Sequence, residues 1–171
     1  MEELKALYGK KIKTPKQIRK IIGQHPRTKT VIMCHGVFDI VHPGHLRHMI
    51  YAKKKADVLI VSITRDAHID KGEFRPHVPE GLRALNLAAF EIVDFVIIDK
   101  ESTPLNNIEF IKPDYFAKGY EYIQEGSYAK TDNEKALPTT DSRRDNASKV
   151  HDKPGLVVVL CVGLVVVFYV W

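Results

Sequence analysis

Features that would place this chain in a specialised structural class are scarce or absent. There are only two cysteines, Cys34 and Cys161, and neither has another cysteine or a histidine at metal-ligand spacing. A zinc site is therefore not expected. We expect the protein to act in a reducing compartment. The amino terminus is charged and lacks the apolar segment of a secretory signal, and no part of the 171 residues repeats. We expect an ordinary globular protein that acts in the cytoplasm.

Long basic runs are also missing. Lysine and arginine number 26 against 21 acidic residues, which leaves a net charge of +5, but their longest run is 53–55 and no aromatic residues are interleaved with it. The chain is therefore not expected to bind nucleic acid. A small positive surplus suits a protein that binds polyphosphates, and Lys53 or Lys54 could reach such a ligand from a helix.

What the chain does contain is a regular alternation of apolar patterns. Apolar spacing predicts helices over 14–22, 43–55, 80–93 and 105–111, and short apolar runs predict strands over 30–34, 58–63, 95–98 and 114–117. Strands that alternate with helices predict an α/β fold with a parallel sheet and right-handed crossovers. The composition changes after residue 124, so we divide the chain into a helical lead (1–26), one domain (27–124), a polar linker (125–153) and an apolar tail (154–171).

Three segments follow the ends of predicted strands: 35–45, 62–75 and 118–122. In parallel sheets, ligands bind beyond the carboxyl ends of the strands. We therefore expect one binding site, assembled from these three loops at one edge of the sheet.

The first of these loops carries the most informative motif, His42-Pro43-Gly44-His45. Proline suits the first position of a helix, because its missing N–H would have no partner there. The amino end of a helix offers unpaired N–H groups and a partial positive charge, and imidazoles three residues apart add donors on the same face. The motif predicts a phosphate site at the start of a helix. Two capping histidines in an ordinary turn are the alternative.

Together with Gly36-Val37-Phe38-Asp39, this motif resembles the HxGH signature of the nucleotidyltransferase (cytidylyltransferase-like) superfamily. Other segments are similar to the adenylyltransferase domain of bifunctional heptose kinase/adenylyltransferases. They are Lys71-Gly72-Glu73-Phe74-Arg75-Pro76, Arg83, Asp94-Phe95-Val96 and 116–122, and the likeness covers roughly residues 12–124. The resemblance implies a Rossmann-like parallel sheet with helices on both faces.

The resemblance also implies an activity. The expected reaction moves AMP from ATP to a sugar phosphate similar to heptose 1-phosphate and releases pyrophosphate, with Mg²⁺ held mainly by the phosphates. A cytidylyltransferase acting on glycerol 3-phosphate or a similar polyol phosphate is the alternative within the family, and a homo-oligomer is expected. The implied residues are His42, His45 and Lys71 for catalysis, Gly36, Val37, Phe38, Asp39, Gly44, Lys118 and Gly119 for the nucleotide, and Arg75 and Arg83 for the substrate phosphate.

Beyond residue 122 the chain departs from the family pattern. The family has a Ser/Thr-rich turn that caps the nucleotide's phosphates, whereas residues 139–143 have suitable types but no strand before them or apolar helix after them. A catalytically impaired nucleotide-binding protein, including one tethered to a membrane, is therefore the alternative from another class. The last 17 residues, 155–171, carry no charge and include eight valines. They are compatible with a membrane anchor, a valine-rich buried strand or a frame-shifted end.

Overall fold

The computed structural model describes residues 2–119, 156–161 and 164–169. Its elements, in chain order, are α1 (Glu2–Tyr8), the 3-10 helix η1 (Gly9–Lys11), α2 (Pro15–Ile22), β1 (Val31–Gly36), α3 (Pro43–Lys53), β2 (Val58–Thr64), the 3-10 helix η2 (Asp66–His68), α4 (Glu80–Ala88), β3 (Phe95–Asp99), α5 (Leu105–Ile111), β4 (Tyr115–Gly119), β5 (Leu156–Cys161) and β6 (Leu164–Tyr169). All four predicted strands and all four predicted helices are present, so the predicted α/β fold class is confirmed.

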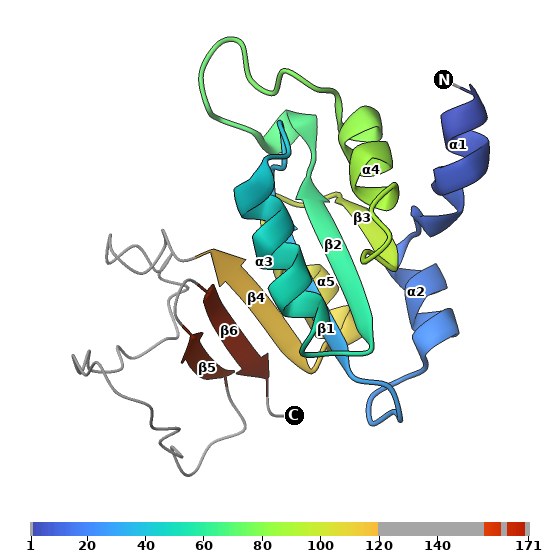
Figure 1. Ribbon diagram of the computed structural model, residues 1–171, viewed down its shortest axis with the longest axis vertical. Coiled ribbons are helices and arrows are strands. Elements are labelled where there is room, and N and C mark those ends of the chain that lie inside the picture. Colours follow the sequence, from blue (N-terminus) through green and yellow to red (C-terminus); the bar gives the residue numbers. More distant parts are fainter. Residues whose placement is uncertain (1, 120–155, 162–163, 170–171) are drawn as a thin grey trace.

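The strands form one sheet in the order β3-β2-β1-β4-β6-β5 (Figure 1). β1 pairs in parallel with β2 and with β4, and β2 pairs in parallel with β3. After β3 the chain crosses back to place β4 on the other side of β1. The strand order therefore reverses between β1 and β4, and in open α/β sheets ligands bind outside the carboxyl ends of the strands at such a point.

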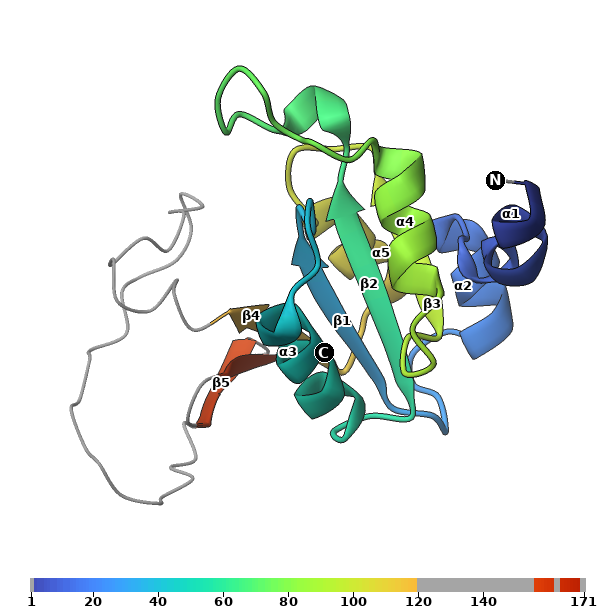
Figure 2. The ribbon, with the colours of Figure 1, turned by 45° about the horizontal axis from the view of Figure 1, so that its top comes forward.

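Side chains on alternate positions of the strands face two separate layers of the core. On one face, Ile32 and Cys34 of β1 pack in an apolar cluster with residues of α3 and α4, among them Met49 and Leu87. On the other face, Val31 and Met33 of β1 pack in a second cluster with residues of α2 and α5. Figure 2 shows α3 and α4 together on one side of the sheet. Helices thus cover both faces, as the resemblance implied.

The predicted boundaries differ most at the end of α4. Apolar spacing predicts a helix to residue 93, but α4 ends at Ala88. The chain then turns through bonds from the amide of Phe90 to the carbonyl of Leu87 and from the amide of Val93 to the carbonyl of Phe90. The ammonium of Lys11 donates to the carbonyl of Phe90 at 2.8 Å. Tertiary contacts therefore end the helix where the apolar pattern alone would continue it.

The apolar tail supplies the last two strands of the sheet. β6 pairs antiparallel with β4, and β5 pairs antiparallel with β6. Of the three interpretations of residues 155–171, a strand agrees with these pairings, although it is two strands rather than one. Among the residues that the structure describes, no helix is both long enough and apolar enough to cross a membrane. The predicted linker, 125–153, and the segment 139–143 within it lie outside the described residues.

Candidate functional site

The predicted phosphate motif lies at the carboxyl edge of the sheet, at the amino end of α3. His42 is the cap of this helix, and its Nδ1 accepts a hydrogen bond from the amide of Gly44 at 3.1 Å. A ring nitrogen that accepts this bond cannot carry the proton, so the neutral imidazole is protonated at Nε2. The cap therefore fixes both the orientation of an exposed imidazole and the atom with which it donates.

The ring of His42 lies against that of His45, which is one turn further into α3. The ring centroids are 4.0 Å apart, and the planes are inclined by 33°. On its other side His45 contacts Phe38, with centroids 5.1 Å apart. Phe38 is buried and has a φ of 50°, a left-handed conformation that non-glycine residues rarely adopt. The turn is thus folded so that Phe38 contacts His45, which in turn contacts His42.

Two glycines in this segment lie close to aromatic rings. A Cβ on Gly36 would lie 3.1 Å from the ring of Phe38, and a Cβ on Gly44 would lie 2.8 Å from Cε1 of His42. The second of these distances is shorter than any ordinary carbon contact. The glycine of the motif therefore makes room for the imidazole that caps the helix.

Asp39 connects this turn to the long loop between η2 and α4. One carboxylate oxygen accepts a hydrogen bond from Nη1 of Arg75 at 2.8 Å, and the other accepts one from the amide of Val78 at 2.9 Å. Burial by itself would raise the pKa of Asp39. The amides of His77 and Val78 and the Arg75 guanidinium outweigh burial and lower the pKa to about 2. Asp39 is therefore an anion that holds the loop beside the motif.

Arg83, predicted to bind a substrate phosphate, is in α4 and is 0% exposed. Its guanidinium donates to the carbonyls of Val78, Val37 and Thr64 and to the carboxylate of Asp66. In this arrangement Arg83 fastens the motif's turn to the end of β2 and to the loop. A direct contact with a substrate phosphate would require these bonds to open, so the structure gives this residue a supporting position.

Lys71 and Arg75 lie on the loop that Asp39 holds. Lys71 is exposed, and Phe74, next to Arg75, is 77% exposed. Figure 1 shows the loop rising at the end of the sheet where α3 begins. At its base, the amide of Asp66 donates to Glu80 at 2.9 Å and the amide of Glu80 donates to Asp66 at 3.0 Å. The sequence analysis did not predict this pair. The signal that could have indicated it is Glu80, an acidic residue in the first turn of a predicted helix.

Lys118 and Gly119 are the last two residues of β4. β4 is in register with β1 through the pair Cys34–Ala117, so their backbone lies at the same edge as the motif. Lys53 lies at the opposite end of α3, where its ammonium bonds to Asp94 at 2.6 Å. Because a helix rises about 1.5 Å per residue, Lys53 lies far along α3 from the motif, and its ion pair with Asp94 favours a structural role over a contact with the phosphates.

The family model described as "Cytidylyltransferase-like" matches residues 33–149. The chain belongs to the cytidylyltransferase-like family. The match includes the motif, the loop of Arg75 and β4, which are the segments that the fold gathers at the carboxyl edge.

Curated relatives of this cytidylyltransferase-like chain are bifunctional proteins. "Bifunctional protein HldE" of Campylobacter jejuni subsp. doylei is 44% identical over 117 residues, which are 67% of this chain and 25% of that protein. The HldE protein of Geobacter metallireducens is 39% identical over 112 residues, 64% of this chain and 23% of that protein. The chain thus spans about a quarter of the length of the relatives it matches.

A solved structure is also similar to this cytidylyltransferase-like chain. The lipopolysaccharide core biosynthesis protein from Thermoplasma volcanium GSS1 is 31% identical, with a TM-score of 0.47, over 50% of this chain and 70% of that chain.

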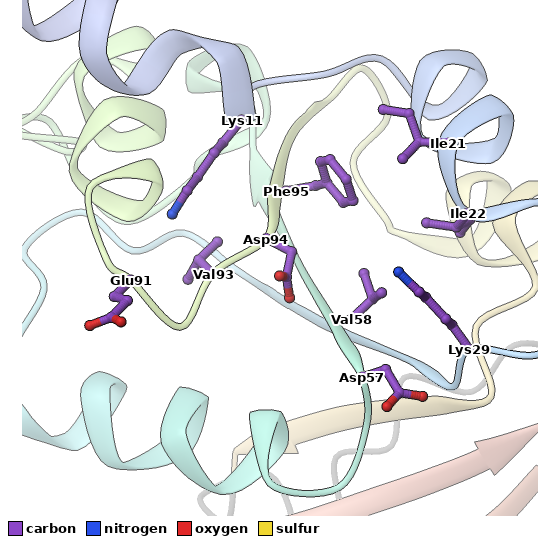
Figure 3. Close-up of a pocket in the computed structure, with 10 residues that line it drawn as sticks. All are labelled: Lys11, Ile21, Ile22, Lys29, Asp57, Val58, Glu91, Val93, Asp94 and Phe95. Atoms are coloured by element: carbon purple, nitrogen blue, oxygen red, sulfur yellow. The ribbon is translucent and has the colours of Figure 1, made fainter.

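The cytidylyltransferase-like domain also has a cavity at the amino edge of the sheet, away from the motif (Figure 3). It measures about 260 Å³, and both charged and apolar side chains line it, including Lys11, Lys29, Asp57 and Asp94. In Figure 3 the carboxylate of Asp94 and the ammonium of Lys29 point toward the same space. None of the predicted site residues lines this cavity. Within the described part of the chain, no group of three or more His, Cys, Asp or Glu side chains could hold a metal ion.

Proposed function

We propose that this chain is a nucleotidyltransferase that moves AMP from ATP to a sugar phosphate similar to heptose 1-phosphate and releases pyrophosphate. The observation that carries the proposal is the pair of stacked histidines at the start of α3, one of which is locked by the amide of Gly44. Membership of the cytidylyltransferase-like family and the bifunctional relatives support it.

In the proposed reaction, a phosphate oxygen of the acceptor attacks the α-phosphorus of the nucleotide. The bond from that phosphorus to the oxygen bridging the α- and β-phosphates breaks, and pyrophosphate leaves with the electron pair. Transfer of this kind needs positioning and charge stabilisation rather than a covalent nucleophile. Burial raises the pKa of the Cys34 thiol to about 12, so this thiol is not a nucleophile.

The proposed roles follow from where the residues lie. The amides at the start of α3 and the Nε2–H of His42 would donate to the α-phosphate and to the leaving group, with His45 stacked behind. Lys71 and Arg75 would approach from the loop and neutralise the charge on the phosphates. Mg²⁺, when bound with the nucleotide, would offset phosphate charge and be held chiefly by phosphate oxygens.

The cytidylyl alternative keeps the same site and changes the nucleotide. The description of the matching family, cytidylyltransferase-like, is compatible with either nucleotide. The acceptor would then be glycerol 3-phosphate or a similar polyol phosphate. Contacts to the base would come from the end of β4, near Gly119, where the backbone lies at the edge that carries the motif.

The test is pyrophosphate release in the presence of Mg²⁺, with ATP and CTP each offered against a panel of sugar and polyol phosphates. Release with ATP and a sugar phosphate, absent without acceptor, is the expected result. Release only with CTP and a polyol phosphate would establish the alternative. Nucleotide binding without release in any combination would overturn both and identify a binding protein.

A further inference from the structure

Four polar side chains gather on one face of the sheet at the carboxyl ends of three strands. Alternation along β1, β2 and β3 places His35, Ser62, Thr64 and Asp99 on the same face as the apolar cluster that α2 and α5 cover. His35 is the register partner of Ser62, and Thr64 is the register partner of Asp99. The same face is apolar along the rest of these strands. Polarity is therefore confined to the edge that carries the candidate site.

These side chains form one chain of hydrogen bonds. Nε2 of His35 lies 3.2 Å from the hydroxyl of Thr64, and Nδ1 lies 3.2 Å from the hydroxyl of Ser62. The hydroxyl of Ser62 donates to Asp99 at 3.2 Å. The carboxylate of Asp99 also accepts from the amide of Glu101 at 3.1 Å.

The direction of every bond in the chain follows from its last member. Because Asp99 only accepts, the proton of the Ser62 hydroxyl points to Asp99, and Nδ1–H of His35 must donate to Ser62. The other ring nitrogen of a neutral histidine is then an acceptor, so Thr64 donates to Nε2. Burial lowers the pKa of His35 to about 4, against the opposing charge of Asp99. At neutral pH His35 is therefore uncharged and held in a single tautomer.

Thr64 links this chain to Arg83 on the opposite side of the sheet. While the hydroxyl of Thr64 bonds to His35, its carbonyl accepts from Nη2 of Arg83 at 2.9 Å. Arg83 also bonds to the carbonyl of Val37, which follows Gly36 at the end of β1. The start of the motif's turn is thus held on one face through the ring of His35 and on the other through Arg83.

We propose that Thr64 and His35 are positioning residues for nucleotide binding, acting by fixing the carboxyl end of β1 from which the turn of the HPGH motif departs. The inference rests on the proposed function, since it takes this turn to be the phosphate site. Ser62 and Asp99 complete the network by fixing which nitrogen of His35 donates. A network that served stability alone could be replaced by apolar side chains of the same shape at little cost.

Thr64→Val tests the proposal, because it replaces one hydroxyl by a methyl group and keeps the carbonyl that Arg83 uses. Thr30→Val is the matched control, since Thr30 loses a similar hydroxyl bond, to Asp57, at the amino edge. We expect Thr64→Val to weaken the affinity for Mg²⁺·ATP and Mg²⁺·CTP by about fivefold or more, as loss of one hydrogen bond would. Thr64→Ser, which keeps the hydroxyl, is expected to restore it, and Thr30→Val to leave it within about twofold. Affinity is measured by calorimetric titration with each nucleotide. Urea unfolding of each variant shows whether the variants being compared are equally stable.

Equal affinity of Thr64→Val and the wild type would overturn the inference, as would equal losses in Thr64→Val and Thr30→Val. Nitrogen NMR of the His35 ring in the wild type is a second test. An Nε2–H tautomer at pH 7 would also overturn the inference. If the wild type binds nucleotide but releases no pyrophosphate, the transferase proposal fails. The comparison of affinities would still test the proposal that Thr64 and His35 position the nucleotide site. If the wild type binds neither nucleotide, both fail.

Discussion

Arg27 and Arg83 hold opposite edges of the same sheet by the same means. The side chain of Arg27 is 3% exposed, and it donates to the carbonyls of Ile111 and Lys112 and to the carboxylate of Asp114 at the amino edge. Arg83 is equally buried and binds three carbonyls and Asp66 at the carboxyl edge. Arg27 fastens the approach to β1 to the end of α5, whereas Arg83 fastens the loops that carry the candidate site.

The surroundings of the two arginines differ more than the arginines do. At the amino edge the side chains of the ion pair between Lys53 and Asp94 are 29% and 34% exposed. At the carboxyl edge Asp39, Ser62 and Asp99 are at most 9% exposed and bonded across separate segments. Burying polar groups costs free energy unless every partner is present. The buried polar side chains at the carboxyl edge are therefore held in a single hydrogen-bonded arrangement. Such rigidity suits a site that must be formed before its ligand binds.

The largest expected effect is on stability and is shared by the two arginines, whereas nucleotide binding should separate them. Arg83→Met leaves three carbonyls and the partly exposed carboxylate of Asp66 without their donor. We expect it to lower the free energy of unfolding by about 3–5 kcal/mol, since each buried carbonyl without a partner costs about 1–3 kcal/mol. Arg27→Met should cost a similar amount, because it leaves Asp114 and two carbonyls in the same condition. Urea unfolding checks both. Only Arg83→Met should also weaken Mg²⁺·ATP binding at temperatures where the variant is folded, and an equal loss in Arg27→Met would contradict the division between the edges.

The next effect concerns catalysis rather than stability. Asparagine is a good helix cap, so His42→Asn should keep the start of α3 while removing the imidazole. We expect kcat for pyrophosphate release to fall by about 10²–10³-fold, the loss typical of one donor to a developing charge. His25→Ala is the control, since His25 pairs with Asp114 at the amino edge. Near-full activity in His42→Asn would show that the site lies elsewhere.

The pH dependence of stability should report His35. Its pKa is about 4 in the folded protein, against about 6.5 in an unfolded chain. Between these values the unfolded chain binds a proton that the folded one does not, so the free energy of unfolding falls as the pH is lowered through this window. With about 1.4 kcal/mol for each pH unit, the total approaches about 3 kcal/mol.

Urea unfolding at intervals from pH 7 to pH 4 measures this loss, and His35→Gln should flatten it. Asp39, whose pKa is lowered to about 2, contributes stability that is lost only as the pH falls below the value of an unfolded aspartate. Asp99 is the charged group that faces His35 through Ser62, and the partners from β2 do not titrate. An unchanged slope in His35→Gln would assign the loss to other groups.

Much of the fold could be predicted from the sequence, because its signals are local. The start of α2 is an example: Thr14 and Gln17 form a capping box around Pro15. The runs of β1 and β2 are apolar at nearly every position, as strands buried on both faces must be. The predicted end of α4 was wrong because contacts distant in sequence, such as that of Lys11, decide it.

The candidate site could be predicted less completely. The motif is contiguous in the sequence. Predicting that His42 and His45 lie together therefore required only the prediction that a helix begins there. The resemblance implied that Arg83 binds a phosphate, but a guanidinium is equally suited to bind phosphate or carbonyl groups. Burial decides between these roles, and burial depends on the packing of α4. The network of His35 joins three strands through residues 27 and 37 positions apart, which no local pattern reveals.

The smallest expected effect compares two glycines at the same place in two helices. Gly44 is the second residue of α3 and Gly81 the second of α4, and both helices begin at the carboxyl edge. Alanine in either should favour the helix by up to about 1 kcal/mol. A Cβ on Gly81 meets nothing within 4 Å, whereas one on Gly44 would lie 2.8 Å from the ring of His42.

Gly81→Ala should therefore be slightly stabilising and leave kcat unchanged. Gly44→Ala should gain nothing in stability and lower kcat by about tenfold, because the imidazole must leave the cap that orients it. Thermal unfolding and pyrophosphate release measure the two effects separately. If Gly44→Ala kept full activity, the orientation of His42 by the amide of Gly44 would not matter for turnover, and the backbone N–H groups of α3 would have to bind the phosphates without it.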